Sequence, residues 1–81
     1  MISCHQYDYI EIVCMYHYPI NISLKSGDLI ECNALDTKRN SQHQECIQVD
    51  IQGIKRLVVL DDIATLTVTV ENPHFTVVSF T

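Results

Sequence analysis

The chain has 81 residues, ten acidic and five basic, and its formal net charge at pH 7 is −5. A chain of this length is expected to form one domain over residues 1–81, and its 47% hydrophobic content supports a packed core rather than a disordered tail. The negative charge argues against direct binding of nucleic acid or of an anionic membrane, because both attract basic surfaces. A basic partner is favoured instead.

The N-terminal segment is predicted to form an amphipathic helix from Ser3 to about His17. Ser3 and Gln6 have the spacing of a capping box, in which each side chain satisfies a backbone N–H group. Pro19 cannot continue a helix, and it favours an extended conformation at the residue before it. Apolar and small residues recur at helical spacing and should face the core: Tyr7, Ile10, Val13, Cys14 and His17.

Beyond Pro19 the apolar period changes to two, which predicts about five strands joined by short turns. The alternating segments are 20–25, 29–35, 46–51, 54–60, 63–70 and 75–80, the last as an edge strand. The run from Leu57 to Leu60 is typical of a strand covered on both faces, and the polar segment 36–43 is expected to be the longest loop. The predicted fold class is α+β and mainly β. In it the helix caps a strongly bent five-stranded antiparallel sheet, forming a small barrel.

The outer face of the predicted helix carries Asp8 and Glu11, whose spacing of three places them side by side. Ile12 and Met15 flank them, and Tyr7 lies at the border of the buried stripe. Carboxylates beside an aromatic ring and apolar area suit an interface with a surface rich in arginine and lysine. The alternative is a solvated helix face whose charges contribute little to binding.

A metal or redox site is the weaker interpretation of the cysteines Cys4, Cys14, Cys32 and Cys46. Cys14 and His17 share a helix face, but Cys4 and His5 lie more than two helical turns away, too far to complete a zinc site. Core packing is therefore favoured, and neither metal nor another cofactor is expected. No signal peptide or membrane-spanning run is visible, so we expect a cytoplasmic protein with reduced thiols.

No residue set in the chain is typical of an enzyme. A glycine-framed nucleophile and a glycine-rich phosphate loop are both missing from the sequence. Asp61 and Asp62 are adjacent, and in a turn such a pair commonly caps a short helical turn. The polar segment 36–43 is a further candidate for partner contact, although most such segments are ordinary connections.

Motifs spread over nearly the whole chain carry a family resemblance. The helix holds the most specific ones, Ile2-x-Cys4, Tyr7-Asp8-x-Ile10-Glu11-Ile12-x-Cys14 and His17. Weaker matches are Ile22-x-Leu24-Lys25-x-Gly27, Lys38-Arg39-Asn40, Leu57-Val58-Val59-Leu60-Asp61-x-Ile63 and Thr76-Val77-Val78. In these positions the sequence resembles the Rof (YaeO) family of Rho-binding antiterminators.

The resemblance implies an Sm-like fold and a non-enzymatic inhibitor of the hexameric termination factor Rho. Such proteins bind the N-terminal RNA-binding domains of Rho and block its primary RNA sites. The implied contacts are Tyr7, Asp8 and Glu11 on the helix and Asn40 in the polar segment. Lys38 and Arg39 stand beside Asn40, but their charge has the wrong sign for a basic groove.

Two other functions remain open at this point. One is an Sm-like module that binds RNA directly, which would need a basic, aromatic-lined surface. The other is a small zinc-binding or redox-sensing protein. The chain is expected to be a monomer or a weak homodimer, the latter through the apolar edge of segment 75–80.

Overall fold

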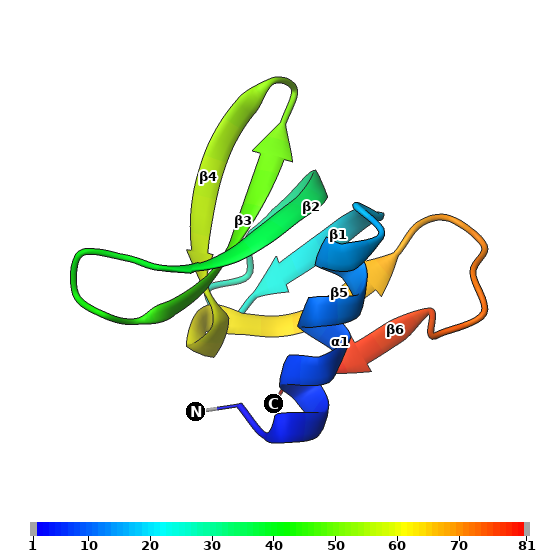
Figure 1. The fold of residues 1–81 in the computed structure, drawn as a ribbon, viewed down its shortest axis with the longest axis horizontal. Helices are drawn as coiled ribbons and strands as arrows, with labels where there is room; N and C mark the ends of the chain where they lie inside the picture. The colour runs from blue at the N-terminus through cyan, green and yellow to red at the C-terminus, as the bar shows by residue number, and fades with distance from the viewer. Residues whose placement is uncertain (1, 81) are drawn as a thin grey trace.

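The computed structural model describes residues 2–80 and shows a helix lying on a curved antiparallel sheet (Figure 1). Helix α1 spans Cys4–Met15, and the strands are β1 Pro19–Leu24, β2 Leu29–Arg39, β3 Glu45–Ile51, β4 Ile54–Val59, β5 Ile63–Val68 and β6 Val77–Ser79. A short 3-10 turn, η1 (Leu60–Asp62), joins β4 to β5. The order across the sheet is β4-β3-β2-β1-β5-β6. The predicted α+β class is confirmed, but the sheet has six strands rather than five.

The start of α1 is the predicted capping box. Ser3 Oγ accepts a hydrogen bond from the Gln6 backbone N–H at 3.2 Å, and Gln6 Oε1 accepts one from the Ser3 N–H at 2.8 Å. Gln6 Nε2 also donates to the Ser79 carbonyl at 3.2 Å. These bonds fix the first turn of the helix and tie it to the C-terminal strand.

The end of α1 differs from the prediction. The helix stops at Met15, and His17 adopts a left-handed conformation with φ 53°. His17 N–H donates to the Cys14 carbonyl and Tyr18 N–H donates to the Val13 carbonyl, the pair of bonds typical of a Schellman helix end. The placement of His17 in the buried stripe was therefore wrong, and its side chain is exposed.

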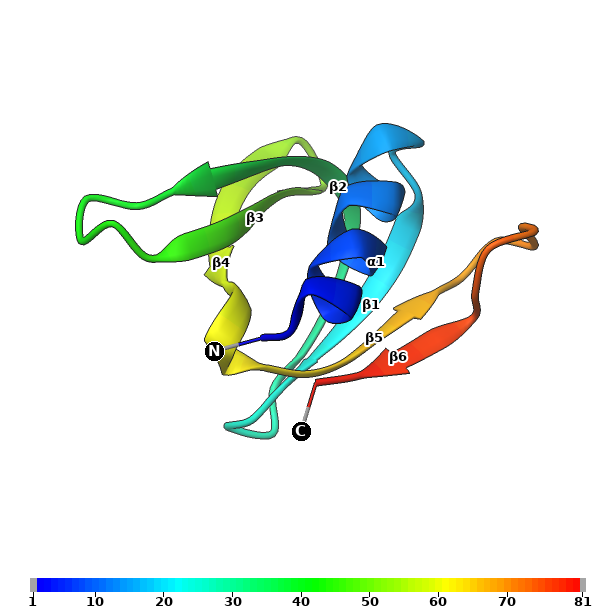
Figure 2. The ribbon, with the colours of Figure 1, turned by 60° about the horizontal axis from the view of Figure 1, so that its bottom comes forward.

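The core lies between α1 and the concave face of the sheet. Figure 2 shows α1 in the space between the β2–β3–β4 half of the bent sheet and the β5–β6 half. The alternating apolar residues of β1, β2 and β3 face this core, and the large side chains that are fully buried are Ile10, Val13, Ile20, Ile22, Ile47, Val49, Ile63 and Leu66. Burial of these side chains stabilises the fold by roughly 1.5–3 kcal/mol each, against the entropy cost of ordering the chain.

Two strand boundaries were predicted wrongly around the polar segment 36–43. β2 continues to Arg39, because Asp36 to Arg39 pair with Gln48 to Glu45 of β3, after a register shift between Ala34 and Asp36. The loop is therefore only residues 40–44. None of the residues 36–39 of β2 is buried, so this arm of the hairpin lacks the apolar alternation by which strands are recognised.

The β4 region also differs from the prediction. β4 is an edge strand, and its Leu57 is 38% exposed, so the expectation that it is covered on both faces was wrong. Leu60 is buried, but it belongs to η1 together with Asp61 and Asp62. β5 ends at Val68, which leaves Val70 exposed, and the last strand is only Val77–Ser79. Its position at the sheet edge is confirmed.

Candidate functional site

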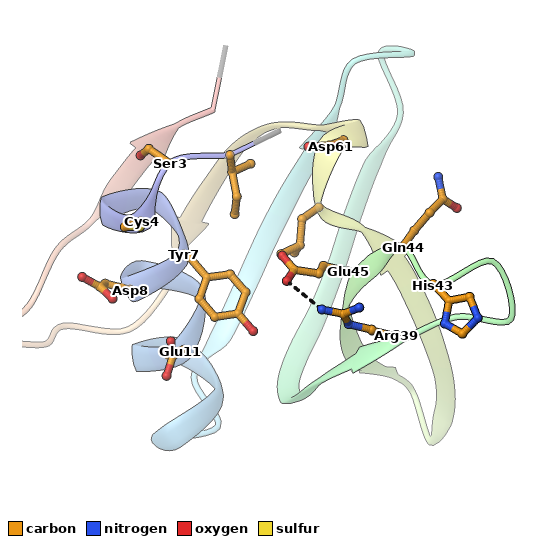
Figure 3. Close-up of a pocket in the computed structure, with 12 residues that line it drawn as sticks. Ser3, Cys4, Tyr7, Asp8, Glu11, Arg39, His43, Gln44, Glu45 and Asp61 are labelled. Atoms are coloured by element: carbon orange, nitrogen blue, oxygen red, sulfur yellow. Dashed lines mark ion pairs between the residues drawn. The ribbon is translucent and has the colours of Figure 1, made fainter.

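A groove of about 650 Å³ lies between the start of α1, the β2–β3 turn and η1 (Figure 3). The capping box sets the helix wall, and the extension of β2 and β3 beyond the sheet body sets the facing wall. The lining residues are Ile2, Ser3, Cys4, Tyr7, Asp8, Glu11, Arg39, His43, Gln44, Glu45, Leu60 and Asp61. The fold thus brings three segments together that are far apart in the sequence.

The helix wall holds the three residues that sequence reasoning placed first. Tyr7 is half-buried and packs against the core cluster, so its ring is held from one side by apolar side chains. Figure 3 shows the ring of Tyr7 directed across the groove towards Arg39 and Glu45. Asp8 and Glu11 are exposed on the same helix and line the rim. Tyr7, Asp8 and Glu11 therefore form one continuous surface.

The facing wall contains an ion pair that joins β2 to β3. Arg39 and Glu45 are cross-strand partners, and Arg39 Nη2 lies 3.7 Å from Glu45 Oε1. Their side chains are 65% and 51% exposed, so solvent screens the pair and it contributes little to stability. Both side chains can therefore exchange this contact for one with a partner.

Asn40 lies beside the groove, and its side chain is engaged within the 40–44 turn. Asn40 Oδ1 accepts hydrogen bonds from the backbone N–H groups of Gln42 and Gln44, and Nδ2 donates to Gln44 Oε1 at 2.9 Å. The turn also includes His43, whose φ of 63° is rare outside glycine. These bonds position His43, Gln44 and Glu45 on the groove wall.

The other predicted contact residues lie elsewhere. Lys38 lines a smaller hollow of about 280 Å³, together with Tyr7, Thr37, Arg39 and Glu45. Ile12 is half-buried and Met15 is 69% exposed, and neither is among the residues that line the groove. The predicted set is therefore divided between the groove, its flank and the far end of the helix.

Charge in the groove is strongly negative. Among the described residues that line it, Asp8, Glu11, Glu45 and Asp61 carry carboxylates and Arg39 carries the only guanidinium. Sequence reasoning missed Glu45 and Asp61 as members of the site. Glu45 can be assigned to the site only when residues 36–39 are recognised as strand, because the pairing of β2 with β3 then sets Glu45 opposite Arg39.

The cysteines divide into one exposed and three buried thiols. Burial raises the pKa of Cys14 to about 12, with a further increase from Asp36 and Glu11. Burial raises the pKa of Cys32 to about 11 against the opposing effect of Arg56, and it also raises the pKa of Cys46. These buried thiols stay protonated at neutral pH. Within residues 2–80, no three His, Cys, Asp or Glu side chains are grouped to hold a metal ion.

Comparison with known proteins identifies the family. The family described as "Modulator of Rho-dependent transcription termination (ROF)" matches residues 1–80. The chain belongs to the Rof family. Two proteins named "Protein rof", from Escherichia coli (strain K12) and Shigella flexneri, are each 29% identical over 66 residues, or 82% of this chain and 77% of theirs. The resemblance stated from the sequence is thus confirmed.

A solved Rof-type structure supports the same fold. "YaeO bound to Magnesium from Vibrio cholerae O395" superposes with a TM-score of 0.89 and 41% identity, over 94% of this chain and 99% of that chain. The family is one that modulates Rho-dependent transcription termination. No helix between residues 2 and 80 has the length and apolar character needed to cross a membrane.

Proposed function

We propose that this Rof-family protein inhibits Rho-dependent termination by binding the N-terminal RNA-binding domains of Rho and blocking their primary RNA sites. The observation that carries the proposal is the acidic groove, in which a half-buried tyrosine lies beside four carboxylates. Tyr7, Asp8 and Glu11 are its central contacts. Glu45 and Asp61 extend the acidic surface across the groove.

The chemistry of the groove resembles that of a single-stranded RNA. A surface that binds such RNA uses basic side chains for the phosphates and stacking contacts for the bases. The carboxylates of Asp8 and Glu11 offer charge-assisted hydrogen bonds to the same arginine and lysine side chains. The ring of Tyr7 offers an aromatic face where a base would stack. A net charge of −5 favours association with that surface and disfavours binding of RNA itself.

The residues around the groove have supporting roles in this proposal. Asn40 holds the turn that forms one wall, since its amide makes three hydrogen bonds within residues 40–44. Lys38 and Arg39 border the contact and limit its negative charge. Ile12 and Met15 add apolar area on the helix side of the partner.

The proposed mechanism is competition for a surface, and no catalytic step or cofactor takes part in it. The inhibitor and RNA occupy the same site, so the degree of inhibition follows their relative affinities and concentrations. The protein acts in the cytoplasm, where Rho engages transcripts. The whole chain acts as one unit, because the groove draws its walls from three segments that are far apart in the sequence, within residues 2–11, 39–45 and 60–61.

The test is binding to purified hexameric Rho with and without cytidine-rich RNA as competitor. Wild-type protein should bind, and the RNA should displace it. The double substitution Asp8→Lys, Glu11→Lys should weaken binding at least about 100-fold, because each removes a charged hydrogen bond of ~1.5–3 kcal/mol and adds repulsion. Circular dichroism should show an unchanged fold, since both side chains are exposed.

A matched control is Glu71→Lys, which reverses an exposed carboxylate outside the groove. It should leave the affinity for Rho within about twofold of the wild type, apart from a small general charge effect. Equal loss in both variants would mean that net charge rather than the groove carries the interaction. Binding of the cytidine-rich RNA by the protein alone would contradict competition as the mechanism.

A further inference from the structure

A second exposed surface lies on the free edge of β4. β4 is the terminal strand of the sheet, and its first four residues, Ile54 to Leu57, are all exposed. Figure 1 shows the β3–β4 hairpin standing clear of α1, with β4 on its outer side. We infer that this edge takes up an acidic, extended peptide segment by strand addition, at a site separate from the acidic groove.

The backbone of β4 is suited to receive another strand. It pairs with β3 on one side from Ile54 to Val59, and the sheet order places no strand on its other side. An edge strand of this kind presents unpaired N–H and C=O groups at every second residue. A segment in extended conformation can satisfy these groups, as in other cases of strand addition.

The side chains of the edge specify what can pair with it. Lys55 and Arg56 are adjacent, so their side chains project to opposite faces of the sheet. Among residues 2–80, neither cation has a carboxylate within ion-pair distance. Ile54 and Leu57 flank them and are 71% and 38% exposed. The complementary antiparallel strand therefore reads apolar, acidic, acidic, apolar.

A second copy of this chain does not meet that requirement at β4. Antiparallel self-pairing about a two-fold axis centred on Lys55 or on Arg56 sets that cation opposite its own copy, and in every register β4 supplies no carboxylate to either cation. Like charges directly opposite one another destabilise a strand pair. The other edge, Val77–Ser79, carries no carboxylate to pair with the two cations. The charges that protect this edge from self-association also select an acidic partner.

The β4 edge is independent of the groove. None of the residues Ile54 to Leu57 lines the groove. Glu45 at the start of β3 lies in the groove wall, whereas Ile51 at its other end pairs with Ile54. About 20 Å of strand separates Glu45 from Ile51, whereas Leu57, at the near end of the β4 site, pairs with Gln48 about 10 Å along β3 from Glu45. One surface can therefore be altered without changing the other.

The inference is tested by nuclear magnetic resonance titration of the full-length chain with a blocked hexapeptide, Thr-Val-Asp-Glu-Val-Thr. The amide signals of Ile54 to Leu57 should shift at millimolar peptide or below, and those of the groove residues should not. A peptide with both acidic residues replaced by lysine should bind at least about tenfold more weakly. Absence of shifts, shifts in the groove alone, or equal binding of both peptides would overturn the inference.

Charge reversal provides the decisive variant. The double variant Lys55→Glu, Arg56→Glu should no longer bind the acidic peptide and should bind the lysine peptide instead. The control Lys25→Glu, in the exposed turn after β1, should bind both peptides as the wild type does. The neutral pair Lys55→Gln, Arg56→Gln should bind both peptides equally weakly. It serves as the test if the reversed variant does not fold. Retention of acidic-peptide binding by whichever variant folds would overturn the inference.

Discussion

The groove beside α1 and the edge of β4 are opposite in charge and in origin. The groove collects carboxylates from residues 8, 11, 45 and 61, which only the fold brings together. The β4 edge is one continuous run, Ile54 to Leu57, with two cations and no acid. A net charge of −5 conceals this separation. The comparison shows that the total charge of a small protein does not describe the charge of each surface.

The two surfaces also differ in how their shape is held. In the groove, Tyr7 packs on the core, and the facing turn is held by the bonds of Asn40. At the β4 edge, the backbone itself is the binding element, and side chains only select among extended segments. Substitutions in the groove should therefore have large and residue-specific effects, whereas substitutions at the edge should act mainly through charge.

Among single substitutions, Tyr7→Ala is expected to reduce the affinity of the groove for Rho the most. Loss of a central aromatic contact in an interface costs about 2 kcal/mol or more, so the affinity for Rho should fall roughly 30-fold. Because Tyr7 also packs against the core, the free energy of unfolding should drop by about 1–2 kcal/mol. Binding measurements with the Rho hexamer and urea unfolding would check both effects.

Tyr7→Phe is the matched control because it keeps the ring and removes only the hydroxyl. It should retain most of the affinity and nearly all of the stability. Binding of the acidic hexapeptide at β4 should stay unchanged in both variants. Full Rho affinity in folded Tyr7→Ala protein would show that the groove does not use this ring.

Most of the fold is predictable from the sequence because its signals are local. The capping box of Ser3 and Gln6 and the alternation in β1, β3 and β5 reflect direct neighbours along the chain. The errors occur where the residues carry no such local signal. His17 takes a left-handed conformation without being glycine, and residues 36–39 form strand although neither face of that extension is fully buried.

The candidate site is predictable only in part, for the same reason. Asp8 and Glu11 share a helix face, so their spacing is sufficient to place them together. Glu45 and Asp61 join them through the β2–β3 register and the η1 turn, which no local pattern specifies. The sequence also suggests Asn40 as a contact, whereas its three hydrogen bonds within the turn indicate a positioning role.

Asn40→Ala is expected to have an intermediate effect. It removes three hydrogen bonds from an exposed turn, each contributing about 1 kcal/mol or less to its order. Affinity for Rho should fall about fivefold to tenfold, because Gln44 and Glu45 lose their fixed position. Nuclear magnetic resonance should show changed amide signals and increased mobility for residues 40–44, while binding of the acidic hexapeptide at β4 stays the same.

The control for that prediction is Ser41→Ala, in the same turn and with an exposed side chain. It should leave both the amide signals of the turn and the affinity unchanged. A positioning role also predicts that Asn40→Asp keeps part of the affinity, since its carboxylate can still accept bonds from Gln42 and Gln44. Loss of affinity in Asn40→Ala with an unchanged turn would instead make Asn40 a direct contact.

The smallest expected effect concerns the internal counter-ion of the groove. Arg39 lies 3.7 Å from Glu45 in an exposed pair, and it partly neutralises the acidic surface. Arg39→Gln should therefore increase the affinity for a basic partner about twofold to fivefold at low salt, in line with the ~0.2–1 kcal/mol of an exposed ion pair. Glu45→Gln should decrease it by a similar factor, and both changes should diminish as salt screens the charges.

The direction of the Arg39 effect separates two roles. If Arg39 acts as a counter-ion, the double variant Arg39→Gln, Glu45→Gln should bind Rho with nearly the affinity of the wild type, because the two substitutions offset one another in charge. If Arg39 contacts the partner directly, Arg39→Gln weakens binding and the double variant is weaker still. A titration of Rho by all three variants over a series of salt concentrations distinguishes these outcomes. The same titration measures how strongly Arg39 reduces the negative charge of the groove, whereas the β4 edge contains no residue of opposite charge.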